Sequence, residues 1–92
     1  MLEGFSARTF SGRLGDAFVV CRDDSGASVE LVSVEGEEPE GRPFSAAFRG
    51  SGDVPLSQGI HRMEHREIGA FELFLVPVGP DGEGLLYEAV FN

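Results

Sequence analysis

Apolar and polar side chains alternate along much of the chain, in short runs separated by glycine, proline and aspartate. A period of two residues is typical of β-strands with one buried face, because successive side chains point to opposite sides of a sheet. The clearest runs are residues 44–49 and 85–91, which we predict to be half-buried strands. The apolar positions that share a face are Phe44, Ala46 and Phe48 in the first run, and Leu85, Tyr87, Ala89 and Phe91 in the second.

Two earlier runs predict a β-hairpin. Residues 17–22 and 28–35 are rich in valine and other strand-forming residues, and the turn sequence Asp-Asp-Ser-Gly at 23–26 lies between them. In the second run, the apolar parity switches between Leu31 and Val32. This switch predicts a β-bulge or a sharp bend at that point.

The run 71–78 is apolar on both faces, with Phe71, Leu73 and Leu75 on one side and Phe74, Val76 and Val78 on the other. A strand with one face in water would alternate with polar residues. The second face is therefore expected to be covered, either by the N-terminal segment folded as a helix or by another molecule. Pro77 cannot donate a ladder hydrogen bond, so it is expected at a sheet edge or a bulge.

The segment before the first strand predicts one short helix. Ser6 is a suitable N-cap, and Phe10 and Leu14 lie one helical turn apart. Gly15 can end the helix in a left-handed conformation. Because 92 residues supply one hydrophobic core, residues 1–92 are expected to form a single domain. The expected fold is all-β: a small antiparallel meander of about six strands, barrel-like or a two-layer sandwich, with this one short N-terminal helix.

Charge narrows the range of partners. The chain has 16 acidic residues, 7 arginines and no lysine, which gives a formal net charge of -9. Such a chain is expected to repel phosphate backbones and anionic membrane surfaces, so neither a nucleic acid nor a membrane is an expected partner. Without lysine, the chain also cannot use Schiff-base chemistry or a P-loop lysine.

Cysteine usage and the start of the chain favour a reducing, cytoplasmic location. Cys21 is the only cysteine, so no intrachain disulfide is possible, and its apolar neighbours are typical of a small buried hydrophobe. The first residues lack the basic and apolar regions of a signal peptide. The longest apolar run, 73–78, is far shorter than the ~20 residues that span a bilayer.

One motif could carry chemistry, because His61, Glu64 and His65 match the H-x-x-E-H pattern of the inverted zinc peptidases. Two histidines four residues apart can chelate one metal ion on a helix. On a strand they lie about 13 Å apart, at ~3.3 Å per residue, beyond the reach of one ion. Gly59 and Gly69 bracket a short segment without a sustained amphipathic face. We therefore predict a strand, no metal or other cofactor, and a metal-dependent hydrolase only as a second alternative.

Several segments resemble an uncharacterised family of small bacterial domains. They are Pro43–Gly50, Gln58–His65, Phe74–Pro80 and Tyr87–Asn92, together with the N-terminal pattern Phe10-x3-Leu14-Gly15-x2-Phe18. The resemblance covers most of the chain. It implies an association with phage-tail-collar-type structural genes, and it implies no catalytic residues, because none is established for the family. At the position of His61 the family pattern more often has tyrosine, which suits a strand and not a zinc chelate.

These features favour a non-enzymatic protein-interaction or assembly domain, part of a phage-tail-like or other multi-protein assembly. The expected partner is another protein or a second copy of the chain. The residues predicted to form the interface are Phe74, Val76, Val78, Tyr87 and Phe91. The first alternative is a β-barrel that binds an apolar small molecule, although six short strands leave little lumen.

Overall fold

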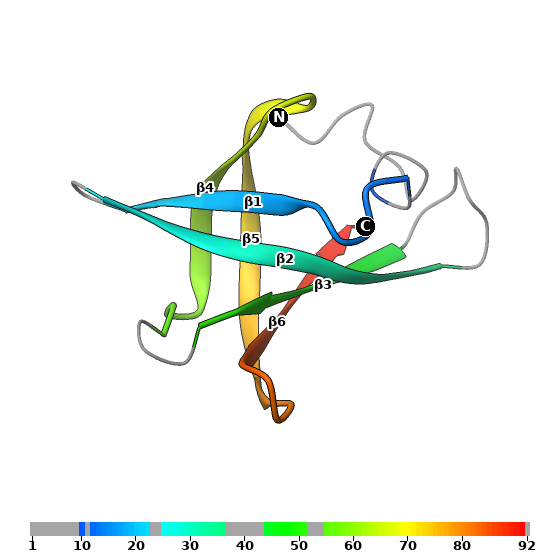
Figure 1. Cartoon of the computed structure of the whole chain (residues 1–92), viewed down its shortest axis with the longest axis vertical. Helices are drawn as coiled ribbons and strands as arrows, with labels where there is room; N and C mark the ends of the chain where they lie inside the picture. The colour runs from blue at the N-terminus through cyan, green and yellow to red at the C-terminus, as the bar shows by residue number, and fades with distance from the viewer. Residues whose placement is uncertain (1–9, 11, 23–24, 37–43, 52–54, 92) are drawn as a thin grey trace.

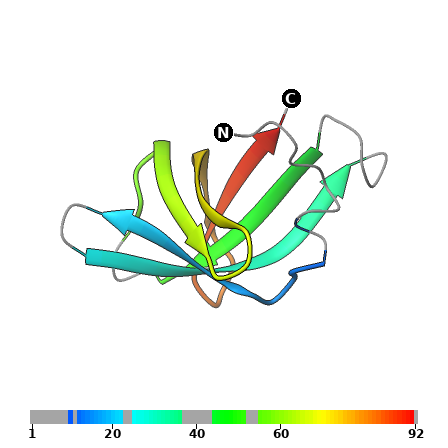
Figure 2. The ribbon, with the colours of Figure 1, turned by 90° about the horizontal axis from the view of Figure 1, so that it is seen from above.

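The protein is described by a computed structural model over residues 10, 12–22, 25–36, 44–51 and 55–91. Within these residues six antiparallel strands close into a barrel (Figures 1 and 2), which confirms the all-β prediction and selects the barrel over the sandwich. No helix of the described residues is long and apolar enough to cross a membrane. The strands are β1 (Ala17–Arg22), β2 (Ser25–Gly36), β3 (Phe44–Gly50), β4 (Gly59–His65), β5 (Gly69–Pro80) and β6 (Leu85–Phe91).

The order of the strands round the barrel differs from a simple meander. The order is β1-β2-β3-β6-β5-β4, and β4 pairs with β1 to close the ring. Strands β1 to β3 and β4 to β6 each form a meander, but β3 pairs with β6, and the chain crosses one end of the barrel between Gly50 and Gly59. The expectation of a simple meander is therefore wrong. Turn signals in the sequence indicate hairpins between successive strands, but the pairings of β3 with β6 and of β1 with β4 join strands far apart in sequence.

The predicted N-terminal helix is not supported by the described residues. Residues 12–15 form a turn, and Gly15 has a φ of 88°, the left-handed conformation expected of it. Phe10 is fully buried, whereas Leu14 is 53% exposed, so the two side chains do not share a buried face. The predicted N-cap, Ser6, lies outside the described residues.

Two bulges lie where the sequence predicts them. The pairing of β2 with β3 shifts between Leu31 and Ser33, beside the switch in apolar parity. The pairing of β5 with β6 shifts between Pro77 and Gly79, which confirms the bulge expected at the proline. Because bulges bend a strand and increase its twist, they allow the two longest strands to curve round a narrow barrel.

Alternate side chains from all six strands fill the interior. The inner faces predicted for residues 44–49 and 71–75 are confirmed, and so is that of the last strand apart from Leu85, which is only half-buried. The buried apolar residues of the strands are Phe18, Val20, Val29, Leu31, Phe44, Ala46, Phe48, Met63, Phe71, Leu73, Leu75, Tyr87, Ala89 and Phe91.

Phenylalanine rings close one end of the barrel. Phe10 precedes β1, and its ring centroid lies 5.2 Å from that of Phe91 and 6.1 Å from that of Phe71. Phe44 and Phe91 stack with centroids 4.3 Å apart. Such pairs contribute about 0.5–1.5 kcal/mol each beyond the area that they bury. Phe10, which lies seven residues before the start of β1, is therefore part of the core.

The segment that crosses from β3 to β4 closes the opposite end. Leu56 in this segment is buried, and its N–H donates a hydrogen bond of 2.9 Å to the hydroxyl oxygen of Tyr87. The Tyr87 ring lies in the interior, so its hydroxyl group reaches from the core to the crossing segment. Beside it, Gly84 packs so closely on the carbonyl group of Gly50 that no side chain would fit there.

The outer face of β5 is exposed. Phe74 is 49% exposed and Val78 is 61% exposed, whereas Val76 is half-buried. Of the two covers expected for this face, the N-terminal segment does not provide one within the described residues, and cover by another molecule stays a prediction.

Candidate functional site

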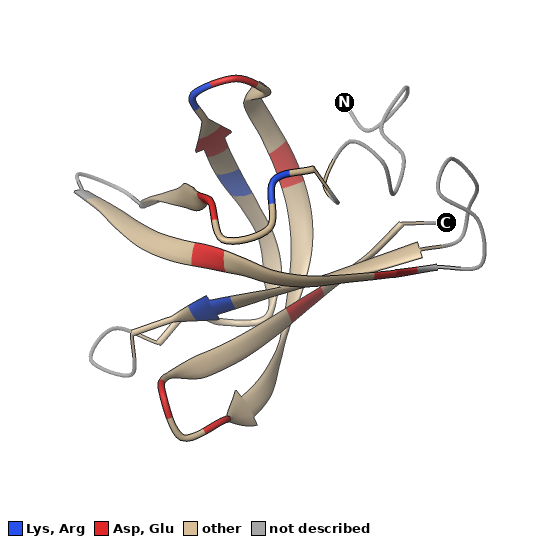
Figure 3. Ribbon diagram, turned by 45° about the vertical axis from the view of Figure 1, so that its right-hand side comes forward, with Lys and Arg blue, Asp and Glu red and all other residues tan. Residues whose placement is uncertain are grey.

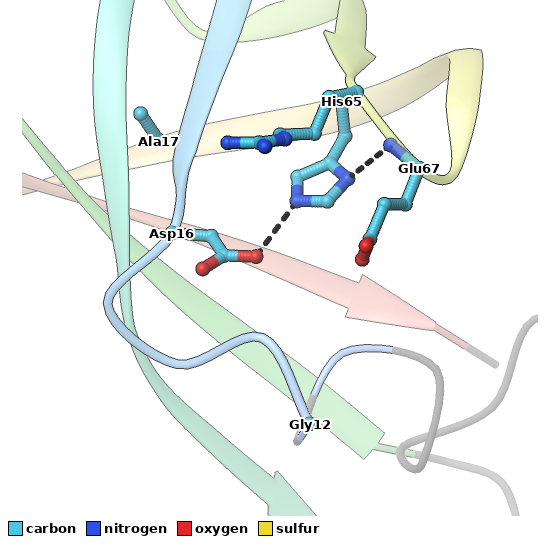
Figure 4. A pocket seen from close by; sticks show the side chains of 6 residues that line it. Gly12, Asp16, Ala17, His65 and Glu67 are labelled. Carbon is cyan, nitrogen blue, oxygen red and sulfur yellow. Dashed lines mark hydrogen bonds and ion pairs between the residues drawn. The ribbon is translucent and has the colours of Figure 1, made fainter.

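A polar pocket lies at the end of the barrel that Phe10 closes, where β1 begins and β4 ends (Figure 4). Its volume is about 360 Å³. It brings one buried histidine close to two carboxylates. The lining residues are Gly12, Asp16, Ala17, His65, Arg66 and Glu67.

His65 is the buried polar residue of this pocket. Its side chain is fully buried, with the ring centroid 4.5 Å from that of Phe18 and Nε2 2.9 Å from Oδ2 of Asp16. On the other side of the ring, Nδ1 accepts hydrogen bonds from the N–H groups of Glu67, at 3.0 Å, and Ile68, at 3.3 Å. Because Nδ1 is an acceptor, we assign the proton of the neutral ring to Nε2, which donates it to the Asp16 carboxylate.

The backbone holds Asp16 opposite this ring. The Asp16 carbonyl accepts the N–H of Leu31 at 3.1 Å, and the N–H of Gly15 donates to the Leu31 carbonyl at 2.8 Å. These two bonds continue the pairing of β1 with β2 beyond the start of β1. Since His65 ends β4, its bond to Asp16 ties the neighbouring strands β1 and β4 together at the rim of the barrel.

The spacing of the cluster resembles that of a metal site. Potential ligand atoms of Asp16, His65 and Glu67 all lie within 4.8 Å of one another. A histidine ligand, however, must offer the metal a free ring-nitrogen lone pair. In His65 the nitrogen that faces Asp16 carries the proton, and the other nitrogen already accepts two backbone N–H groups. The His65 ring therefore has no free lone pair for a metal ion, and its contacts fit a structural hydrogen-bonded pair with Asp16.

The three residues of the H-x-x-E-H pattern are not brought together. They lie on strand β4, as predicted, where His61 Nε2 is 2.7 Å from the carbonyl oxygen of Ser57 and Glu64 is exposed. Only His65 belongs to the pocket. Sequence reasoning missed its partner, Asp16, which is 49 residues away. The one signal that could have pointed to it is an aspartate directly before an apolar strand.

A second candidate site is an exposed apolar surface on the outside of β4 and β5. We define the apolar strip as Ile60, Phe74, Val76 and Val78. Ile60 and Phe74 face each other directly across the two strands and are 68% and 49% exposed. Val76 continues the apolar strip along β5, because alternate residues of a strand share a face. Val78 is exposed two residues further along the strand, at the bulge between Pro77 and Gly79.

Charged side chains border the apolar strip. The next cross-strand pair beyond Ile60 on the same face is Arg62 with Glu72, and both side chains are exposed. On the other flank, Val76 faces the exposed Glu88 of β6. Figure 3 shows acidic positions on β5, on β6 and in the turn between them. The charged residues beside the apolar strip are thus mainly acidic.

The comparison with known proteins gives a family without an assigned function. A family model described as Domain of unknown function (DUF6916) matches residues 5–91, a range that includes all six strands. The chain belongs to the DUF6916 family. No curated protein and no solved structure matches the chain. The expectation of an uncharacterised domain family is confirmed.

The predicted interface residues of this DUF6916 domain divide between surface and core. Tyr87 and Phe91 are both 1% exposed and face the interior, so neither is available to a partner on the outer surface. Strand β6 pairs with both β3 and β5, and its aromatic residues fill the barrel instead of forming a free edge. Sequence reasoning also missed Ile60, since its run lacks clear alternation. The three predicted residues that belong to the apolar strip are Phe74, Val76 and Val78.

A network of charges holds the hairpin turn of the DUF6916 barrel against β3. Arg49 Nε donates a hydrogen bond of 2.7 Å to Asp81, and its guanidinium lies 3.7 Å from Glu30 and 3.8 Å from Glu83. The backbone N–H of Glu83, and then the Arg49 guanidinium, hold the pKa of Asp81 below its ordinary value. The hydrogen bond to Asp81 is the main cause that raises the pKa of Arg49.

Proposed function

We propose that the chain is a non-enzymatic protein-interaction domain that binds a partner protein through the apolar strip. The observation that carries the proposal is the cross-strand pair of Ile60 and Phe74, two large apolar side chains exposed side by side on the barrel wall. Burying apolar surface in a partner contributes about 25 cal/mol per Å² to the free energy of association.

The size and border of the apolar strip support docking. Ile60, Phe74 and Val78 together expose on the order of 300 Å², the range of the largest apolar patch on a typical monomer, which is often functional. A standard interface buries about 800 Å² on each partner and has an apolar centre inside a polar rim. The apolar strip with its charged border has this arrangement.

The strands that carry the apolar strip support specific binding. β4 and β5 are paired without interruption from Gly59–Leu75 to His65–Gly69. Side chains on paired strands are already positioned before a partner arrives, which lowers the entropic cost of association.

Other regions support a non-catalytic role over the alternatives. Both ring nitrogens of His65 are engaged, so the polar pocket offers no free base or ligand there. The interior of the barrel is filled by aromatic and aliphatic side chains, with Phe10 and Leu56 at its ends, which disfavours a bound small molecule inside it. The sequence resemblance to a family associated with phage-tail-collar-type genes supports a multi-protein assembly as the setting.

The test compares partner capture by the wild-type chain with that by the double variant Ile60→Ser/Phe74→Ser. Tagged chains are expressed in the native cells, and proteins that co-purify are quantified by mass spectrometry, then purified and titrated. We expect the affinity of the double variant for the partner to be lower by roughly 30-fold or more, the effect of replacing a hot-spot residue. Leu14→Ser is the matched control, because Leu14 is as exposed but lies in the turn before β1. Wild-type affinity in the double variant would contradict the proposal.

A further inference from the structure

The border of the apolar strip has an excess of negative charge. The outward-facing charged residues beside it on β4, β5 and β6 are two carboxylates, on Glu72 and Glu88, and one guanidinium, on Arg62; a third carboxylate, on Glu64, lies two residues beyond Arg62 on β4. Arg62 is 3.9 Å from Glu64, so its charge is partly matched within β4. Glu72 lies at one end of the apolar strip and Glu88 at its flank on β6, and together they leave a net negative border.

We infer that the partner presents an apolar centre surrounded by arginine or lysine side chains, an inference that rests on the proposed function. Complementary charges round an apolar centre accelerate encounter and set orientation, while the apolar contact supplies most of the affinity. Glu72 at one end and Glu88 at one flank would each face a basic side chain. The partner is a different protein with a basic docking surface.

A second copy of the chain does not meet this requirement. A two-fold symmetric dimer places the same patch of each subunit against the other. Docking two apolar strips would bring Glu72 and Glu88 of each copy to one interface, between chains that each carry a formal net charge of -9. Like charges brought together in an interface oppose association.

The test selects peptides instead of assuming a partner. A displayed library of random peptides is enriched on the wild-type chain and counter-selected on Ile60→Ser/Phe74→Ser. This double variant keeps the net charge of -9, so it removes peptides that bind acidic surfaces elsewhere on the chain. We expect the peptides that remain to combine aromatic or aliphatic residues with an excess of arginine and lysine.

Charge-reversal variants then locate the basic contacts. For the selected peptides, Glu72→Lys and Glu88→Lys are each expected to weaken binding about two- to fivefold, the range of an exposed ion pair, with a smaller effect at high salt. Glu35→Lys is the matched control, because it makes the same change in net charge on an exposed residue of β2, away from the apolar strip.

Each outcome separates the inference from the proposed function. The inference would be overturned by strip-dependent peptides that lack a basic excess and bind Glu72→Lys and Glu88→Lys as tightly as the wild-type chain. Docking on the apolar strip would then still stand. A library without any strip-dependent peptide would remove the proposed function, and the inference with it. Sedimentation of the full chain in 0.15 M salt is expected to show a monomer; a dimer that Phe74→Ser abolishes would overturn the choice of a different, basic partner.

Discussion

The two ends of the barrel are closed by different means. At one end the ring of Phe10 is packed among the rings of Phe18, Phe44, Phe71 and Phe91, and the rim is tied by a side-chain bond between His65 and Asp16. At the other end the aliphatic residue Leu56, of the described part of the connecting segment, covers the core, and the hydroxyl group of Tyr87 holds its backbone. Closure of the first end therefore depends mainly on the packing of aromatic rings. Closure of the second end depends mainly on a hydrogen bond donated to a side chain of the core.

This difference shows that the stability of a small barrel depends on its connecting segments as well as on its strands. A chain of this length buries a limited fraction of its surface, so residues outside the strands matter more than in a larger domain. Phe10 and Leu56 both lie outside the six strands and are both buried. Breaking one end at a time measures what each contributes.

The largest effect is expected at the aromatic end. Phe10→Ala removes the ring at the centre of the cluster and leaves a cavity that the strands cannot fill, so unfolding free energy should fall by about 3–5 kcal/mol. Leu56→Ala should cost about 2–3 kcal/mol, because a connecting segment can relax into part of the space. Urea-induced unfolding of both variants gives the comparison. A larger loss for Leu56→Ala would reverse the proposed ranking of the two ends.

Removing one hydroxyl group should weaken the other end. Tyr87→Phe keeps the ring in the core but leaves the buried N–H of Leu56 without its acceptor, so the expected loss is about 1–3 kcal/mol. Hydrogen exchange should show faster exchange at the Leu56 amide, while amides of the aromatic end keep their protection. An unchanged exchange rate at Leu56 would mean that the hydroxyl group does not hold the crossing segment.

The corresponding bond at the aromatic end should matter less. Asp16→Ala leaves the Nε2–H of buried His65 without a carboxylate, but Asp16 is 42% exposed beside the polar pocket, so water can replace it. We expect a loss of about 0.5–1.5 kcal/mol, and a smaller loss in the control Asp16→Asn, which keeps an oxygen acceptor. Nitrogen-15 NMR of the His65 ring should report a proton on Nε2 in the wild type; a proton on Nδ1 would contradict the hydrogen-bond assignment.

Local patterns in the sequence predicted most of the strands. Alternation identified the buried faces of β3 and β6, and the parity switch at Leu31 located a bulge. Barrel closure could not be predicted in the same way, because the pairings of β3 with β6 and of β1 with β4 join residues far apart in sequence. Phe10 and Leu14 show a further limit, since helical spacing suggested one shared face and the turn separates them.

The candidate site was predictable only in part, because local patterns show single strands and do not show which strands pair. The doubly apolar run on β5 identified Phe74, Val76 and Val78 as surface residues in need of cover. Ile60 becomes part of the apolar strip only through its register with Phe74. Tyr87 and Phe91 were assigned to an interface because a last strand suggested a free edge, and pairing on both sides of β6 removes that edge.

The smallest effect is expected from acid at the end that Leu56 closes. The pKa of Asp81 is lowered below its ordinary value of 3.8 by the N–H of Glu83 and by Arg49. Its bonds therefore add stability above that value, and this contribution is lost as the pH falls through the lowered pKa of the folded chain. Asp81→Asn should flatten the acid side of the stability profile slightly, whereas Glu35→Gln, on an exposed residue of β2, serves as the control. An Asp81 carboxyl that titrates at or above its ordinary pKa in a carbon-13 NMR titration would show that the turn between β5 and β6 is not held by this charge, and Tyr87 would then be the main tie at that end.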